Sequence, residues 1–86
     1  METFSYTVTD PIGIHARPAG LLAKLCGSMT GTTVTVEKNG KSAECVRLMA
    51  VMGLGIQCGD TVTFTLTGGD EKKNAEALRA YCEKNL

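Results

Sequence analysis

Two segments near opposite ends of the chain alternate apolar residues with threonine or serine, and this pattern restricts the fold more than any other feature. The apolar positions are every second residue: Phe4, Tyr6 and Val8 within residues 3–9, and Val62, Phe64 and Leu66 within residues 61–67. A period of two is that of a β-strand with one buried face. The sequence therefore predicts a sheet that other elements must cover on one side.

Residues 32–37 and 42–45 are predicted to add a β-hairpin to this sheet. Val34 and Val36 alternate with threonines, and the four residues from Lys38 to Lys41 separate the two segments. The pair Asn39-Gly40 at the centre suits the positive φ angles of a two-residue hairpin turn.

Helical spacing of apolar residues predicts three helices, over residues 16–26, 47–54 and 70–86. The apolar positions are Ala19, Leu22, Leu25 and Cys26 in the first, Leu48, Met49, Val51 and Met52 in the second, and Ala75, Leu78, Cys82 and Leu86 in the third. The order of elements is then βαββαβα. It predicts an α+β fold in which a mostly antiparallel sheet of four strands carries three helices on one face.

Length and charge limit the classes of function. A chain of 86 residues predicts a single domain, residues 1–86, without a separate substrate-binding domain. Nine Lys and Arg residues balance nine Asp and Glu residues, so we expect neither nucleic acid nor an anionic membrane surface as a partner. No apolar run approaches the roughly 20 residues of a membrane span, so membrane insertion is not expected.

The four cysteines show no spacing that is typical of a metal site. Cys26, Cys45, Cys58 and Cys82 form no CxxC pair, and only one histidine accompanies them. We expect each to be a reduced thiol that packs as a small buried hydrophobic residue, with a zinc site or disulfides as less favoured alternatives. No cofactor is expected. The first residues lack a secretion signal, which predicts a cytoplasmic protein.

The only histidine, His15, lies where a glycine-containing loop leads into the first predicted helix. The first N–H groups of a helix are unpaired and the helix dipole is positive there, so an anion is stabilised. A neutral imidazole can act as a nucleophile, and Arg17 can contact phosphate oxygens through two nitrogens. Pro18 is tolerated in a first helical turn. The alternative is a capping or surface histidine; a hydrolase triad or a metal ligand has less support.

Three segments together carry a resemblance to a known family: residues 13–19 (GIHARPA), 39–42 (NGKS) and 48–56 (LMAVMGLGI). They resemble the histidine-containing phosphocarrier family, HPr, of the bacterial phosphoenolpyruvate-dependent sugar phosphotransferase system. The resemblance covers essentially the whole chain. It implies an open-faced β-sandwich of four antiparallel strands with three helices, which agrees with the βαββαβα order.

The resemblance also implies roles for residues around the first helix. His15 would accept a phosphoryl group on Nδ1, Ala16 and Arg17 would bind that group, and Pro18 would shape the site. Enzyme I would donate the phosphoryl group and sugar-specific enzyme IIA domains would accept it. The protein would then be a phosphoryl carrier and not an enzyme.

A second implied site is a docking patch for these partners. The resemblance places Leu48, Met49 and Met52 on an exposed surface beside His15, and Arg47 and Lys24 would belong to it. The alternative is that the apolar residues are core residues of a short helix, as we expect for Val51, and that Lys24 is a solvated lysine.

The sequence departs from the family at the start of the second helix. Many members carry there a serine that an ATP-dependent kinase phosphorylates, and the alignment places Arg47 at that position. We therefore expect no regulatory phosphorylation at this place. Two other interpretations stay open: a regulatory HPr paralogue that acts as a protein-binding sensor, and a structural domain with an incidental histidine.

Overall fold

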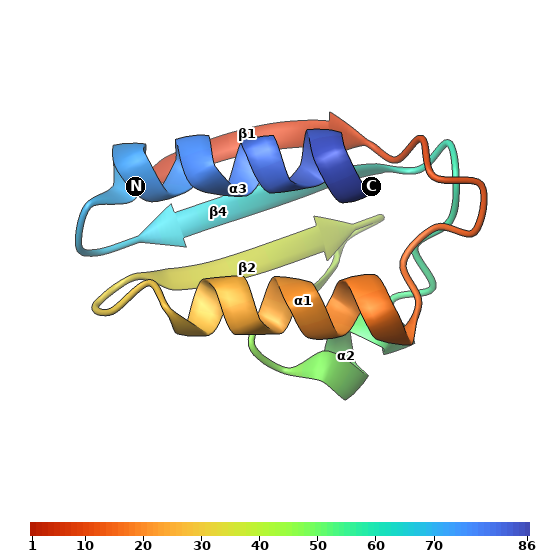
Figure 1. The fold of residues 1–86 in the computed structure, drawn as a ribbon, viewed down its shortest axis with the longest axis horizontal. Coiled ribbons are helices and arrows are strands. Elements are labelled where there is room, and N and C mark those ends of the chain that lie inside the picture. The colour runs from red at the N-terminus through yellow and green to blue at the C-terminus, as the bar shows by residue number, and fades with distance from the viewer.

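The computed structural model describes residues 1–86 and contains seven elements in the predicted order (Figure 1). They are β1 (Glu2–Thr7), α1 (Ala16–Gly27), β2 (Thr33–Lys38), β3 (Lys41–Glu44), α2 (Leu48–Gly53), β4 (Thr61–Thr67) and α3 (Glu71–Asn85). The βαββαβα order is confirmed. No predicted boundary differs from the observed one by more than two residues.

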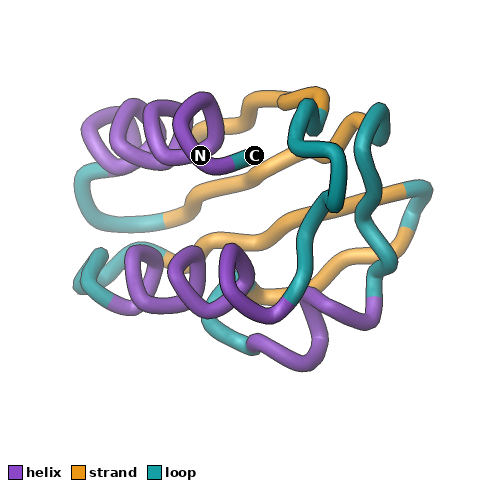
Figure 2. Tube along the Cα trace, turned by 45° about the vertical axis from the view of Figure 1, so that its right-hand side comes forward, coloured by secondary structure: helices purple, strands orange, loops and turns teal.

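The four strands form one antiparallel sheet in the order β1-β4-β2-β3. Phe64 in the central strand β4 lies opposite Phe4 on one side and Val36 on the other. The helices α1 and α3 lie along the same face of the sheet, and the short α2 flanks α1 (Figures 1 and 2). The predicted α+β fold with helices on one face is therefore confirmed. None of the helices combines the length and the apolar character that crossing a membrane requires.

The hairpin between β2 and β3 has the predicted turn. Lys38 pairs with Lys41, so Asn39 and Gly40 alone connect the strands. Both have positive φ angles, 52° and 83°, which Asn and Gly adopt at little cost.

A single core of 18 apolar residues lies between the sheet and the helices. The sheet contributes Phe64, whose ring stacks on that of Phe4 with centroids 5.3 Å apart. The helices contribute Leu22, Val51 and Leu78, all fully buried. No polar or charged side chain is buried, so burial of apolar surface is what holds the helices on the sheet.

The cysteines follow the prediction at three of four positions. Cys26, Cys45 and Cys82 are buried in the core and no disulfide is formed. A hydrogen bond with Cys26, together with burial, raises the pKa of the Cys45 thiol far above its usual range. The prediction is wrong for Cys58, which is exposed because it lies in the loop between α2 and β4; its Sγ lies 3.7 Å from the carbonyl oxygen of Thr9.

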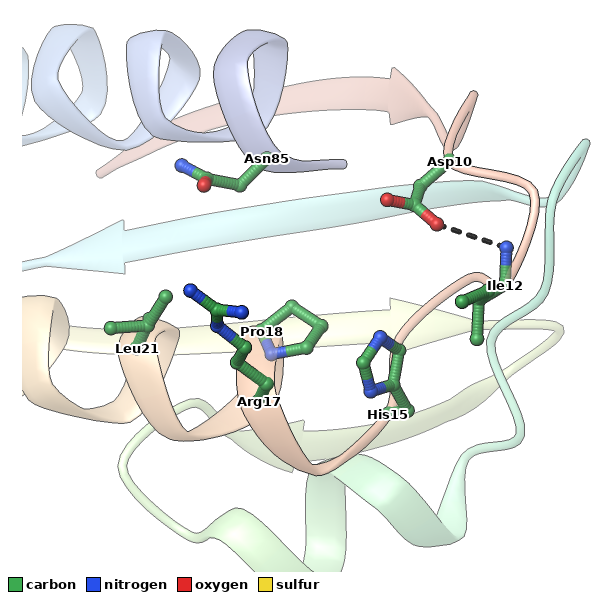
Figure 3. Close-up of a pocket in the computed structure, with 7 residues that line it drawn as sticks. All are labelled: Asp10, Ile12, His15, Arg17, Pro18, Leu21 and Asn85. Atoms are coloured by element: carbon green, nitrogen blue, oxygen red, sulfur yellow. Dashed lines mark hydrogen bonds between the residues drawn. The ribbon is translucent and has the colours of Figure 1, made fainter.

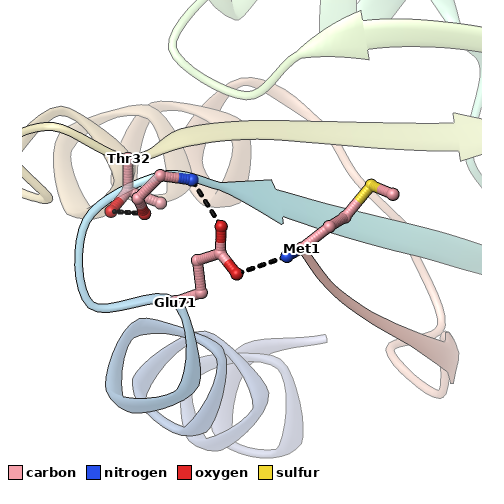
Figure 4. Close-up of polar contacts among 4 residues, drawn as sticks. Met1, Thr32 and Glu71 are labelled. Carbon is pink, nitrogen blue, oxygen red and sulfur yellow. Dashed lines mark hydrogen bonds and ion pairs between the residues drawn. The ribbon is translucent and has the colours of Figure 1, made fainter.

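The start of α3 is fixed to two strands by polar contacts (Figure 4). The Glu71 carboxylate accepts a hydrogen bond from Gly68 N (2.6 Å) and pairs with the Met1 ammonium group (2.5 Å). The Thr32 hydroxyl, just before β2, donates to Gly68 O (2.9 Å). Asp70 is the N-cap residue of α3, and its side chain accepts a hydrogen bond from Lys73 N. These contacts join the start of α3 to the residues that flank β1 and β4.

Two neighbouring leucines on α1 provide a test of this packing. Leu22 is fully buried, whereas Leu21 is 44% exposed. Leu22→Ala should lower the free energy of unfolding by about 2 to 5 kcal/mol, because it leaves a cavity in the core. Leu21→Ala should lower it by about 0.5 kcal/mol. Urea unfolding followed by circular dichroism measures both; equal losses would show that α1 does not pack through the face described.

Candidate functional site

A cavity of about 360 Å³ opens at one end of the molecule, between the start of α1, the loop from β1 to α1, and the end of α3 (Figure 3). Seven residues line it: Asp10, Ile12, His15, Arg17, Pro18, Leu21 and Asn85. The structure therefore brings together three residues that the sequence singled out, His15, Arg17 and Pro18. We refer to this cavity as the His15 pocket.

His15 is the N-cap residue of α1 and its side chain is free to react. Its backbone is extended (φ −128°, ψ −168°), and its carbonyl accepts from Ala19 N at 3.0 Å, the first hydrogen bond of the helix. The imidazole forms no capping hydrogen bond. It is half-buried and projects into the His15 pocket (Figure 3). The ring nitrogens are thus not occupied by a structural role.

Arg17 and Pro18 occupy the first turn of α1 and have different surroundings. Arg17 is exposed and none of the ion pairs in the structure includes it, so its guanidinium is available to an anion. Pro18 is buried, and its carbonyl oxygen accepts a 2.7 Å hydrogen bond from the Tyr81 hydroxyl of α3. Burial raises the pKa of Tyr81 to about 12, so the hydroxyl keeps the proton that it donates. This bond ties the first turn of α1 to α3.

The loop before His15 is held by a turn at Asp10. The Asp10 side-chain Oδ1 accepts from Ile12 N at 2.9 Å, and its carbonyl oxygen accepts from Gly13 N at 3.0 Å. Asp10 N in turn donates to an oxygen of Leu86 at 2.7 Å. Such a side-chain-to-backbone turn reduces the freedom of the residues that lead into the helix.

The same loop rests on the segment between α2 and β4. Ile14 N donates to Ile56 O at 3.0 Å, and Gly59 N donates to Val8 O at 2.8 Å. Gly13 is the closest point of the contact: it has a φ of +78°, and a Cβ atom there would lie 2.6 Å from Ile56 O. Only glycine fits both the conformation and the space.

An ion pair fixes that supporting segment to the sheet. Lys38 Nζ at the end of β2 lies 2.8 Å from Asp60 Oδ2 and donates to Gly55 O at 2.7 Å. The Asp60 carboxylate also accepts from Gln57 N at 2.8 Å. The hydrogen bond from Lys38, and then that from Gln57, lower the pKa of Asp60. The loop that carries His15 is therefore supported by a segment that is itself held at both ends.

The other predicted site residues lie outside the His15 pocket. Ala16 is the exposed first residue of α1, and Lys24 is exposed in its last turn. On α2, Leu48 and Met49 are exposed, Met49 by 76%. Met52 is exposed only in part: it is half-buried, because it packs against the core.

Arg47 is the N-cap residue of α2 and is exposed. Its side chain makes no capping hydrogen bond and pairs with Glu44 at 3.7 Å. An exposed pair at this distance contributes little to stability. Arg47 occupies the position of the regulatory serine found in many HPr proteins, and its side chain does not cap the free N–H groups at the start of α2.

Four residues that line the His15 pocket were not predicted: Asp10, Ile12, Leu21 and Asn85. In the sequence, Asp10 stands beside Pro11 as in an ordinary turn, and Leu21 lies beside the apolar stripe of α1. Asn85 comes from the other end of the chain, and no spacing in the sequence relates it to His15. No group of three or more His, Cys, Asp or Glu side chains is arranged to hold a metal ion.

The chemistry of this arrangement is that of a nucleophile beside an anion site. An unpaired imidazole and an unpaired guanidinium face one cavity, and the first N–H groups of α1 are free by helix geometry. No serine or cysteine lines the pocket, so it contains no partner for a hydrolase triad. Such an arrangement can hold an anionic group beside an imidazole nucleophile.

Comparison with known proteins relates the whole chain to one family. The family model described as "PTS HPr component phosphorylation site" matches residues 2–84. The phosphocarrier protein HPr of Mycoplasma genitalium is 34% identical over 85 residues, which cover 99% of this chain and 97% of that protein. The HPr-like protein Crh of Halalkalibacterium halodurans is 38% identical over 72 residues, 84% of each chain. A crystal structure of HPr from Thermoanaerobacter tengcongensis superposes with a TM-score of 0.91 at 28% identity, covering 98% of this chain and 93% of that one.

The contact of Gly13 with Ile56 can be tested with a matched glycine. Gly31 has nearly the same φ, +81°, but open space where a Cβ would be. Gly31→Ala should cost about 1 to 2 kcal/mol of unfolding free energy from backbone strain alone. Gly13→Ala should cost about 1 to 3 kcal/mol more, because the added atom meets backbone. Thermal and urea unfolding give both values, and equal costs would contradict the close contact.

Proposed function

Since this chain belongs to the HPr family of phosphotransferase-system phosphocarriers, we propose that His15 accepts a phosphoryl group from enzyme I and passes it to enzyme IIA domains. The family role is that of a phosphocarrier and not of a catalytic enzyme. The observation that supports the assignment to His15 is its free imidazole in a cavity shared with Arg17. A cytoplasmic location is part of the same proposal.

In the proposed transfer, an imidazole nitrogen of His15 attacks the phosphorus atom carried by enzyme I. The N–P bond to His15 forms while the bond to the donor residue breaks, and the reverse exchange follows with the acceptor domain. The charge lies on the phosphoryl oxygens throughout, so positioning and electrostatic stabilisation are what the protein must supply. The choice of Nδ1 rests on the family resemblance.

The groups that would stabilise the phosphoryl oxygens lie in the first turn of α1. Arg17 supplies a guanidinium that no carboxylate of the protein neutralises. The N–H groups of Ala16 and Arg17 have no carbonyl partner within the helix, and they lie at the positive end of its dipole. Pro18 has no N–H to offer, and its role is to hold the turn through its carbonyl bond with Tyr81.

The surface around the His15 pocket would receive the partner proteins. Leu48 and Met49 are exposed on α2, which packs beside α1. Ile12 and Leu21 add exposed apolar surface at the rim of the pocket itself. Flexible methionine side chains suit a surface that must bind more than one partner. We place Arg47, Met52 and Lys24 at the edges of this docking surface.

A regulatory role is the second candidate function. A relative with 38% identity is an HPr-like protein, Crh, so a paralogue that binds a partner as a sensor is compatible with the same fold. Such a sensor need not surrender its phosphoryl group quickly, whereas a carrier must. For both candidate functions, the N-cap position of α2 holds Arg47, which has no hydroxyl that the regulatory kinase could phosphorylate.

The carrier proposal predicts acid-labile phosphorylation at one residue. Incubation with enzyme I, magnesium and phosphoenolpyruvate should add one phosphoryl group, detected by intact mass and lost in mild acid. His15→Ala should abolish the gain, and Arg17→Ala should slow it about 10²-fold, because a charge-stabilising group is lost. The matched control is Arg79→Ala, an arginine of α3 that stacks on Phe4 outside the His15 pocket. Labelling that persists in His15→Ala would contradict the proposal.

The serine-phosphorylation branch is tested separately. Incubation with HPr kinase and ATP should leave this chain unmodified, while an HPr that carries the regulatory serine is modified in the same reaction. Peptide mass analysis should also find Ser42, the nearest serine before α2, unphosphorylated. Kinase-dependent phosphate on any residue near Arg47 would overturn this part of the proposal.

A further inference from the structure

Asp10 is the one carboxylate in the wall of the His15 pocket. The cavity is lined by seven residues, and their formal charges are one positive, Arg17, and one negative, Asp10. His15 and Asp10 line this same cavity of about 360 Å³, and exposed charges interact over a screening length of about 10 Å at 0.1 M salt. A phosphoryl group on His15 would therefore lie within electrostatic range of this carboxylate.

The position and charge of Asp10 are both defined by its contacts. One side-chain oxygen, Oδ1, accepts from Ile12 N at 2.9 Å, so the carboxylate cannot swing freely out of the loop. Its other oxygen points away from that bond, across the cavity toward the side where Asn85 lies (Figure 3). No lysine or arginine forms an ion pair with it. Its negative charge is thus fixed in place and not neutralised.

We propose that the Asp10 carboxylate raises the phosphoryl-transfer potential of His15, by disfavouring the charge that phosphorylation brings into the pocket. This inference rests on His15 being the phosphoryl acceptor. A phosphate ester carries about 1.5 to 2 negative charges at neutral pH, and like charges at this range repel. Arg17 stabilises the loaded state and Asp10 offsets part of that stabilisation. The phosphoryl group is held, but weakly enough to be passed on.

The substitution Asp10→Asn isolates the charge from the turn. The asparagine side-chain oxygen can still accept from Ile12 N, so the loop keeps its hydrogen bond. Asp70→Asn is the matched control: Asp70 also accepts a backbone N–H through its side chain, at the start of α3, and it does not line the His15 pocket. Both variants lose one negative charge, and only one loses it beside His15.

The test is a competition for a limited supply of phosphoryl groups. Each variant is mixed with an equal amount of ¹⁵N-labelled parent chain, a catalytic amount of enzyme I and substoichiometric phosphoenolpyruvate. Each exchange breaks one N–P bond and forms another, with no further reactant. At equilibrium, intact mass gives the ratio of phosphorylated variant to phosphorylated parent. Asp10→Asn should hold about 3 to 10 times more than the parent, and the excess should shrink in 1 M salt, where screening is strong.

The outcomes separate this inference from the proposed function. If the parent chain takes up no phosphoryl group from an active enzyme I, the carrier proposal fails and this inference with it. If the parent is phosphorylated but Asp10→Asn shares the label equally, or exceeds the parent no more than Asp70→Asn does, the role of Asp10 is overturned. An excess that salt does not reduce would also overturn it, because a structural effect of the substitution is not screened.

Discussion

The position of His15 depends on one close contact between two backbone segments, Gly13 against Ile56. His15 belongs to no strand and only begins a helix, so its position is set by the loop before it. Side-chain packing holds that loop only in part, because Ile14 is buried in the core while Ile12 faces solvent. Backbone hydrogen bonds to residues 56–60 also hold it, and the bond from Ile14 N to Ile56 O lies where Gly13 can approach closely because it has no side chain.

Rigidity at His15 is thus transmitted from the sheet through polar contacts. Lys38 is the last residue of β2, and its ion pair with Asp60 fixes the segment that supports the His15 loop. On the other side, Tyr81 of α3 holds the carbonyl of Pro18 in α1. The apolar core fixes the helices relative to the sheet. The Lys38–Asp60 ion pair and the Tyr81–Pro18 hydrogen bond then fix the residues around the pocket relative to the sheet and to α3. A carrier gains from such support, because positioned groups lower the barrier to transfer.

The fold could be predicted from the sequence because its signals are local. Alternation in residues 3–9 and 61–67, the Asn39-Gly40 turn and the helical stripes each determine an element, and one-faced elements leave few ways to pack. His15, Arg17 and Pro18 could be predicted because they lie together in one short motif, residues 13–19. The presence of Asp10 and Asn85 in the pocket could not be predicted from local spacing. Asn85, for example, reaches the pocket only because α3 packs beside α1. The partial burial of Met52 and the exposure of Cys58 likewise depend on tertiary packing and have no signature in local spacing.

The composition of the pocket also explains why a carrier site differs from a binding site. A site built only to bind phosphate would gather cations, and a group bound so strongly would not be released to an acceptor. Here one arginine is present and one carboxylate stands in the same wall, while apolar Ile12 and Leu21 form the rim. A partner that covers the rim excludes water, which strengthens every charge interaction inside. In the proposed transfer, the balance between Arg17 and Asp10 would therefore matter most when a partner covers the pocket.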